Sequence, residues 1–154
     1  MRELLGAIAA LQPDGVILTP PHSENPLITQ LLEAQGISFA RIGSRQPGSG
    51  FAVAMDEDGA ARLATEHLIG LGHERIGFIA GPDDYALSGW RVDGWRQAMA
   101  DARLSTENLL AQGDFGFASG RAAATFLLDG ATPPTAIVAS SDQMALATLE
   151  LARE

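Results

Sequence analysis

The sequence contains no cysteine and no long hydrophobic run. Without cysteine, the chain has no disulfide, no thiolate nucleophile and no cysteine-ligated metal, a composition typical of cytosolic proteins. None of its apolar stretches reaches the length that a membrane-spanning helix needs. The N-terminal stretch MRELLGAIAALQPDG is too short and too acidic for a secretory signal. These absences predict a cytoplasmic protein that has no membrane partner.

Positive charge is also scarce. The basic residues number 10, all of them arginine, against 19 acidic residues, which gives a formal net charge of -9. Because an acidic surface repels phosphate backbones, this chain by itself is a poor candidate for nucleic-acid binding. Hydrophobic residues make up 46% and charged residues 19% of the sequence, which favours a folded globular protein. Its 154 residues suit one domain or part of one.

Two residue patterns alternate along the chain. Short apolar runs bounded by glycine, proline or aspartate are typical of strands buried on both faces of a parallel sheet; they predict strands at 14–19, 37–43, 51–56, 75–81 and 135–141. Segments of helical period predict helices at 2–11, 25–36, 59–72, 88–102, 117–128 and 142–153. This alternation predicts right-handed βαβ units and an α/β fold. Because the first and last elements are helices without a flanking strand, we expect the fold to be truncated at both ends.

Two of these helices have predictable ends. The helix at 25–36 has Asn25 as its N-cap, Pro26 at its first position and Gly36 at its close. The helix at 59–72 stops at Gly72. Its spacing predicts a buried apolar face made of Ala60, Leu63, Ala64, His67, Leu68 and Leu71, with His67 as a packed core histidine.

Catalytic and metal-binding patterns are weak. The sequence has no GxSxG elbow, and its three histidines show no partnered spacing. In HLIGLGH the two histidines are six residues apart, which places them on different faces of a helix. A dinucleotide site needs GxGxxG directly after a strand, whereas GSGFAV precedes one. We therefore expect no enzyme activity, no metal and no cofactor.

Polar and aromatic residues gather instead at the predicted carboxyl ends of the strands, the edge at which open α/β sheets bind ligands. Taken singly, each has an ordinary explanation: Asp142 as a helix cap, Asp56 as a turn residue, Phe115 as core, and Arg91 as a solvated helix residue paired with Asp93 or Asp84. Their shared location nevertheless predicts one common site, formed by Thr19, Asp56, Arg91, Phe115, Ser141 and Asp142.

Several motifs resemble those of bacterial regulators of the lactose-repressor (LacI/GalR) family, in the same order and spacing. They are DGVILTPP, VAMDEDGAARLATEHLIGLGHERIGFIAGP through SGWRVDGW, QGDFGFASG and PPTAIVASSDQMALATLELA. The resemblance covers the chain from about Asp14 to Arg153. It implies two parallel-sheet α/β/α subdomains of the type I periplasmic-binding-protein-like fold, hinged around a small-molecule cleft. Residues 1–72 would be the latter part of the N-terminal subdomain, and 76–154 the first part of the C-terminal one.

The resemblance also implies roles for the six site residues. Arg91 would bind effector hydroxyls or a carboxylate through its planar fork, and Phe115 would stack on the ligand ring. Thr19, Asp56 and Ser141-Asp142 match further cleft positions. Many family members have Asn-Asp where this chain has Ser141-Asp142, so the sugar of any particular member does not transfer to it.

The implied function is that of the effector-sensing portion of a transcriptional regulator. Such a protein would bind a sugar or sugar derivative, form a homodimer, and bind operator DNA through a helix-turn-helix upstream of Met1. Two alternatives remain open. A periplasmic sugar-binding protein of the same fold would serve transport, and an α/β enzyme would need a partnered catalytic group.

Overall fold

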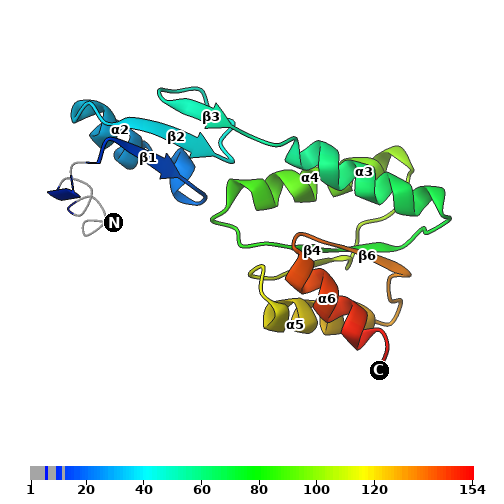
Figure 1. Ribbon diagram of the computed structural model, residues 1–154. Coiled ribbons are helices and arrows are strands. Elements are labelled where there is room, and N and C mark those ends of the chain that lie inside the picture. Colours follow the sequence, from blue (N-terminus) through cyan, green and yellow to red (C-terminus); the bar gives the residue numbers. More distant parts are fainter. Residues whose placement is uncertain (1–5, 7–9, 12) are drawn as a thin grey trace. The chain divides into compact units, whose positions relative to one another are not determined.

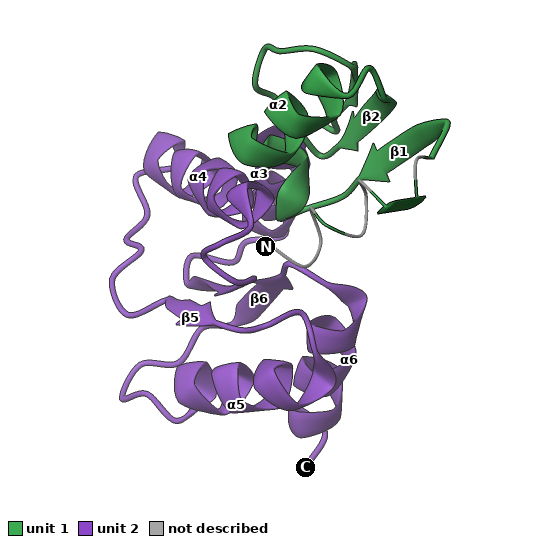
Figure 2. Cartoon of the chain, turned by 90° about the vertical axis from the view of Figure 1, so that its left-hand side faces the viewer, with its two compact units in different colours: residues 1–55 green, residues 56–154 purple. Residues whose placement is uncertain are grey.

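The chain divides into two compact units. The computed structural model describes residues 6, 10–11 and 13–154, and its units are Met1–Met55 and Asp56–Glu154 (Figure 2). Helix α3 (Glu57–Gly70) packs against α4 (Ala86–Asp101), so α3 belongs to the second unit. The subdomain division expected at 72–76 lies later in the chain and stays a prediction. The helix expected at 2–11 falls largely outside the described residues.

The first unit holds a parallel sheet in the order β1-β2-β3 (Figure 1). Its strands are β1 (Gly15–Leu18), β2 (Ser38–Ile42) and β3 (Phe51–Val53), with the 3-10 helix η1 (His22–Glu24) and α2 (Pro26–Ala34) between the first two. The predicted ends of α2 are confirmed. The Asn25 side chain accepts a hydrogen bond from the Leu27 N–H at 3.0 Å, and Gly36 follows the helix with a φ of 66°.

Strands β1 and β2 of this sheet are buried on one face, and β3 is exposed. Leu18 and Phe39 of the strands pack against Ile28 and Leu32 of α2. Ile17 is 69% exposed, and Phe51 and Val53 are also exposed. The expectation of strands buried on both faces is therefore wrong for β1 to β3 as described, because α2 covers one face of β1 and β2 and leaves β3 exposed.

The second unit is a three-layer α/β/α sandwich. Its parallel sheet has the order β5-β4-β6, with β4 (Ile76–Ala80), β5 (Leu110–Gln112) and β6 (Ala136–Ala139). Helices α3 and α4 lie on one face, and α5 (Phe117–Leu128) and α6 (Asp142–Leu151) on the other (Figures 1 and 2). Every residue of β4 is buried, as predicted for a central parallel strand. Two parallel-sheet α/β units confirm the predicted fold class.

Each face of this sheet has its own hydrophobic core. On one face, Ile76 and Phe78 pack against Trp95 and Met99 of α4. The fully buried Trp95 also donates its indole N–H to the Ile76 carbonyl at 3.1 Å. On the other face, Ile79 packs against residues of α5 and α6, including Leu127 and Met144. Residues of all three strands therefore pack on both faces of the sheet.

Helix α3 buries a face that largely differs from the one predicted, of which Leu68 alone packs against the core. Ala61 and Thr65 point inward, whereas Leu63 is 68% exposed, and Leu71 and His67 are also exposed. The reason is the close approach of α4: a Cβ added at Gly94 would overlap the Asp58 backbone. Only small side chains fit such a contact.

No helix among the described residues is long and apolar enough to cross a membrane.

Candidate functional site

Arg91 links three elements of the second unit. From the second turn of α4, its Nε donates to Oε2 of Glu57 at 2.7 Å, and its Nη1 donates to the Ser140 carbonyl at 2.7 Å. Glu57 is buried at the first position of α3, while the Arg91 side chain keeps 25% of its surface exposed. Arg91 is thus a fixed, partly exposed cation at the carboxyl end of β6.

The ion pair corrects one alternative for Arg91. Its partner is neither Asp93 nor Asp84 but Glu57, which lies 34 residues earlier in the chain. Asp93 instead approaches Arg96 at 3.8 Å on the exposed side of α4. Arg91 is therefore a positioned side chain and not a solvated one.

Phe115 adopts a backbone conformation that is rare for a bulky residue. Its φ is 70°, in the left-handed region, within the loop that joins β5 to α5. Its ring meets that of Tyr85 edge-on, with centroids 5.4 Å apart. A Cβ at Gly81, just after β4, would overlap the Phe115 ring, so the ring lies directly over the backbone there. Such strained residues concentrate at functional sites.

Ser141 joins Phe115 to Arg91. Its hydroxyl donates to the Phe115 carbonyl at 2.9 Å and accepts from the Met144 N–H at 3.3 Å, which makes Ser141 the N-cap of α6. The preceding residue, Ser140, accepts the hydrogen bond from Arg91. Asp142 follows as the exposed first residue of α6, and so does not itself provide the cap. The structure thus brings Arg91, Phe115 and Ser141 together, with Asp142 beside them.

The other two predicted residues have defined local positions. Asp56 is the N-cap of α3, since its carboxylate accepts from the Gly59 N–H at 3.3 Å, and it directly precedes Glu57. Thr19 is exposed after β1 in the first unit, where its carbonyl accepts from the His22 N–H at 2.9 Å. Ligand contact by either residue stays a prediction.

Asp114 stabilises the loop that carries Phe115. Its carboxylate accepts hydrogen bonds from the Ser119 hydroxyl and from the Gly116 N–H, the latter at 2.8 Å. The Ser119 bond, followed by the Gly116 bond, lowers the pKa of Asp114 below its ordinary value. The loop is therefore held on both sides of Phe115 by groups outside the sheet.

Sequence reasoning missed Glu57, Tyr85 and two buried hydroxyls. The acidic run MDEDG at the start of α3 is typical of the first turn of a helix, so its sequence did not single out Glu57. Tyr85 is the only tyrosine in the sequence and belongs to no recognisable motif. The Oγ atoms of Ser88 and Ser140 are buried without a hydrogen-bond partner. Ser88 Oγ, like the Phe115 ring, lies close to Gly81, and Ser140 adjoins Ser141. Buried hydroxyls without a partner are uncommon in folded proteins, so these two distinguish this edge of the sheet from an ordinary packed core.

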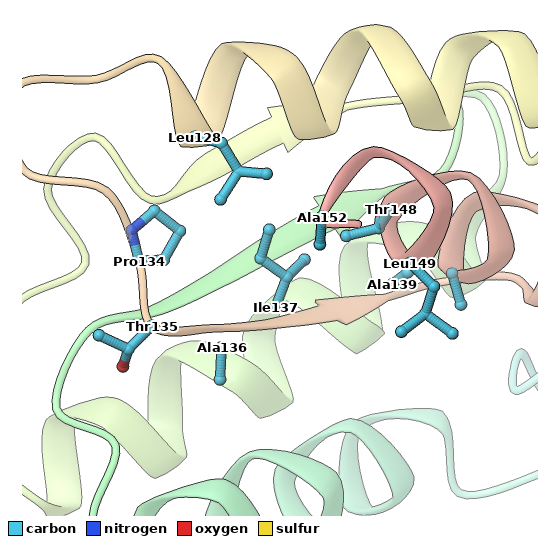
Figure 3. Close-up of a pocket in the computed structure, with 10 residues that line it drawn as sticks. Leu128, Pro134, Thr135, Ala136, Ile137, Ala139, Thr148, Leu149 and Ala152 are labelled. Carbon is cyan, nitrogen blue, oxygen red and sulfur yellow. The ribbon is translucent and has the colours of Figure 1, made fainter. Parts of the chain in front are cut away.

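A cavity of about 430 Å³ lies elsewhere in the second unit, between β6, α6 and the end of α5 (Figure 3). Its lining is almost wholly apolar, with side chains such as Leu128, Ile137 and Leu149. The Thr148 hydroxyl at its wall donates to the Met144 carbonyl at 2.8 Å. None of the six predicted residues lines this cavity, and it has little with which to bind a polar ligand.

The described residues contain no group of three or more His, Asp or Glu side chains that could hold a metal ion. His73 is engaged in the fold, with its Nδ1 2.9 Å from the Thr135 hydroxyl. The sheet edge brings together a guanidinium, a carboxylate, hydroxyls and two aromatic rings, groups that can form hydrogen bonds and stacking contacts.

The sequence of this chain matches a known protein family. A family model described as "Periplasmic binding proteins and sugar binding domain of LacI family" matches residues 3–153. The chain belongs to this family. It is 39% identical over 153 residues to the HTH-type transcriptional regulator CelR of Thermobifida fusca, covering 96% of this chain and 44% of that protein. It is 30% identical to the repressor PurR of Escherichia fergusonii, covering 99% of this chain and 46% of that protein.

Solved structures of LacI-family regulators share the fold. A CelR–cellobiose complex has a TM-score of 0.85 and 38% identity, covering 99% of this chain and 47% of that one. A LacI-family regulatory protein from Chloroflexus aggregans has a TM-score of 0.82 and 33% identity, covering 99% and 55%. The predicted membership of the LacI family is confirmed. The chain spans less than half the length of the curated relatives it matches.

Proposed function

We propose that this chain is the effector-sensing portion of a LacI-type transcriptional regulator, and that its effector is a sugar or sugar derivative. The observation that carries the proposal is the meeting of Arg91 and Phe115 at the carboxyl edge of the sheet, through Ser140 and Ser141. A fixed guanidinium and an aromatic ring are the two groups that a cyclic polyol requires, one for its hydroxyls and one for its apolar face. The cellobiose in the CelR structure supports this class of ligand.

The regulator would act in the cytoplasm through a change in subunit geometry. Ligand contacts made by both subdomains would bias their relative rotation, which changes how a dimer presents DNA-binding domains that lie outside this chain. Coupling of this kind amounts to about 1–3 kcal/mol. Because the relatives named above are regulators, they favour this function over the alternative of a transport protein.

Titration of the full-length protein with a panel of neutral sugars, cellobiose among them, tests the proposal. We expect at least one sugar to bind, and Phe115→Ala to weaken that sugar by about 1–2 kcal/mol, or roughly 5- to 30-fold, because the ring face over the ligand is lost. Phe126→Ala is the matched control, since this ring is 65% exposed on α5. Equal losses in both variants, or no binding by the wild type, would contradict the proposal.

We also expect the full-length protein to be a homodimer with α6 near the interface. This helix buries Met144 and Ala147 within its own unit but leaves Leu146 59% and Leu149 54% exposed. Exposed leucines on one helix are suited to a partner surface. Sedimentation velocity should show a dimer at micromolar concentration, and Leu146→Glu should shift it toward monomer. A wild-type protein that sediments as a monomer counts against this assignment.

A further inference from the structure

Glu57 is the residue at the Arg91 site that the proposed function leaves unexplained. It is 6% exposed, and its Oε2 is bound by Arg91 Nε at 2.7 Å. Its other oxygen, Oε1, makes no hydrogen bond to a described residue. This oxygen is not one of the fully buried polar atoms without a partner, so part of its surface is exposed. Arg91 likewise makes no described hydrogen bond through Nη2. The pair therefore offers a donor and an acceptor side by side.

Assuming the proposed effector role of this site, we propose that Glu57 determines ligand specificity: it positions and neutralises Arg91 so that the site selects a neutral polyhydroxyl ligand and rejects its carboxylate analogue. A hydroxyl group both donates and accepts, so adjacent sugar hydroxyls satisfy Arg91 and Glu57 at once. A carboxylate only accepts, and it would place a second negative charge against Glu57.

The surroundings reinforce this selection. Asp56 directly precedes Glu57, and Asp142 follows the Ser140-Ser141 segment that contacts Arg91. Two further acidic residues thus adjoin, in the chain, the segments that bind Arg91. An anionic ligand would gain the attraction of Arg91 but meet the repulsion of Glu57, whereas a neutral ligand meets hydrogen-bonding groups of both kinds.

A purely structural role for Glu57 predicts something different. An acidic residue in the first turn of a helix stabilises the helix dipole, and Glu57 stands at that position in α3. If this were its only role, its removal would lower stability without changing which ligands bind. Ligand selectivity therefore separates the two roles, and thermal unfolding alone does not.

The experiment compares Glu57→Gln with wild type in the full-length protein. Binding is measured by calorimetry for each neutral sugar that the wild type binds, beginning with cellobiose, and for the aldonic acid of that sugar, such as cellobionate. In Glu57→Gln the amide oxygen still accepts from Arg91, but the negative charge is gone. We expect the neutral sugar to weaken by about threefold and the acid to tighten by about tenfold.

Two further variants control the result. Glu66→Gln removes the same charge from an exposed pair with Arg62 farther along α3, and should leave the ratio of the two affinities unchanged. Glu57→Asp keeps the charge and should keep the preference for the neutral sugar. If the wild type binds sugars but Glu57→Gln leaves the ratio of the affinities for sugar and acid unchanged, the Glu57 assignment alone is overturned. The same holds if the wild type prefers the acid. A wild type that binds no sugar overturns the proposed function together with it.

Discussion

Replacing Arg91 by alanine in the full-length protein is expected to weaken effector binding by about 1.5–3 kcal/mol, or roughly 10- to 150-fold. The lost contacts are charge-assisted hydrogen bonds from a guanidinium that the fold already holds in place. Its two intramolecular bonds, to Glu57 and to Ser140, leave the outer edge of the fork for a ligand. Isothermal titration with the sugar that the wild type binds measures this loss.

The same substitution should also lower stability, since it leaves the buried Glu57 carboxylate without its partner. Removing one member of a buried ion pair is costly, and we expect a loss of about 1–3 kcal/mol in the free energy of unfolding. The double variant Arg91→Ala/Glu57→Gln removes the uncompensated charge and should recover much of that stability without recovering binding. Arg96→Ala on the exposed side of α4 serves as the control. Unchanged affinity in Arg91→Ala would remove this arginine from the site.

Most strands and helices could be predicted from the sequence, because their positions depend on local residue patterns. Apolar runs between turn residues located five of the six described strands, and caps such as Asn25 and Gly36 located helix ends. The sixth strand, β5, was missed because it is only three residues long, Leu110–Gln112, and lacks β-branched residues. Its place in the sheet comes from its pairing with β4, which is a non-local interaction.

Burial was less predictable than element type. The spacing of Leu63 and Leu71 in α3 indicated an inward face, yet both are exposed, because α4 approaches through Gly94 on the side of Ala61. Helical period shows which residues share a face, but not which neighbour that face meets. A small-residue contact between two helices leaves a weaker pattern than a leucine stripe does.

The positions of the candidate site residues in the fold were predictable, but their contacts were not. Phe115 and Ser141 follow strand ends, Arg91 lies in the second turn of the helix after β4, and strand ends in a parallel sheet share one edge. The partner of Arg91 could not be predicted, since Glu57 lies on another helix and is one of several acids near a helix start. The left-handed backbone of Phe115 is likewise set by the loop, through Asp114 and Ser141.

Trp95→Ala should have the largest effect on stability, a loss of about 3–5 kcal/mol in the free energy of unfolding. The indole is fully buried and packs against Phe78, with ring centroids 5.6 Å apart. Its removal leaves a large cavity between α4 and β4. It also deprives the Ile76 carbonyl of the hydrogen bond it accepts from the indole N–H. Urea unfolding followed by circular dichroism measures the change.

Trp95→Phe separates the two contributions to that loss. Phenylalanine keeps most of the apolar contact with Phe78 but has no N–H to donate to Ile76, so we expect a loss of about 1–2 kcal/mol. Phe126→Ala removes an exposed ring from α5 and should cost less than about 0.5 kcal/mol. Because Gly81 directly follows β4 and lies against the Phe115 ring, a Trp95→Ala protein that remains folded should also bind its sugar less tightly. Wild-type stability in Trp95→Ala would show that the α4–β4 core does not hold this edge of the sheet.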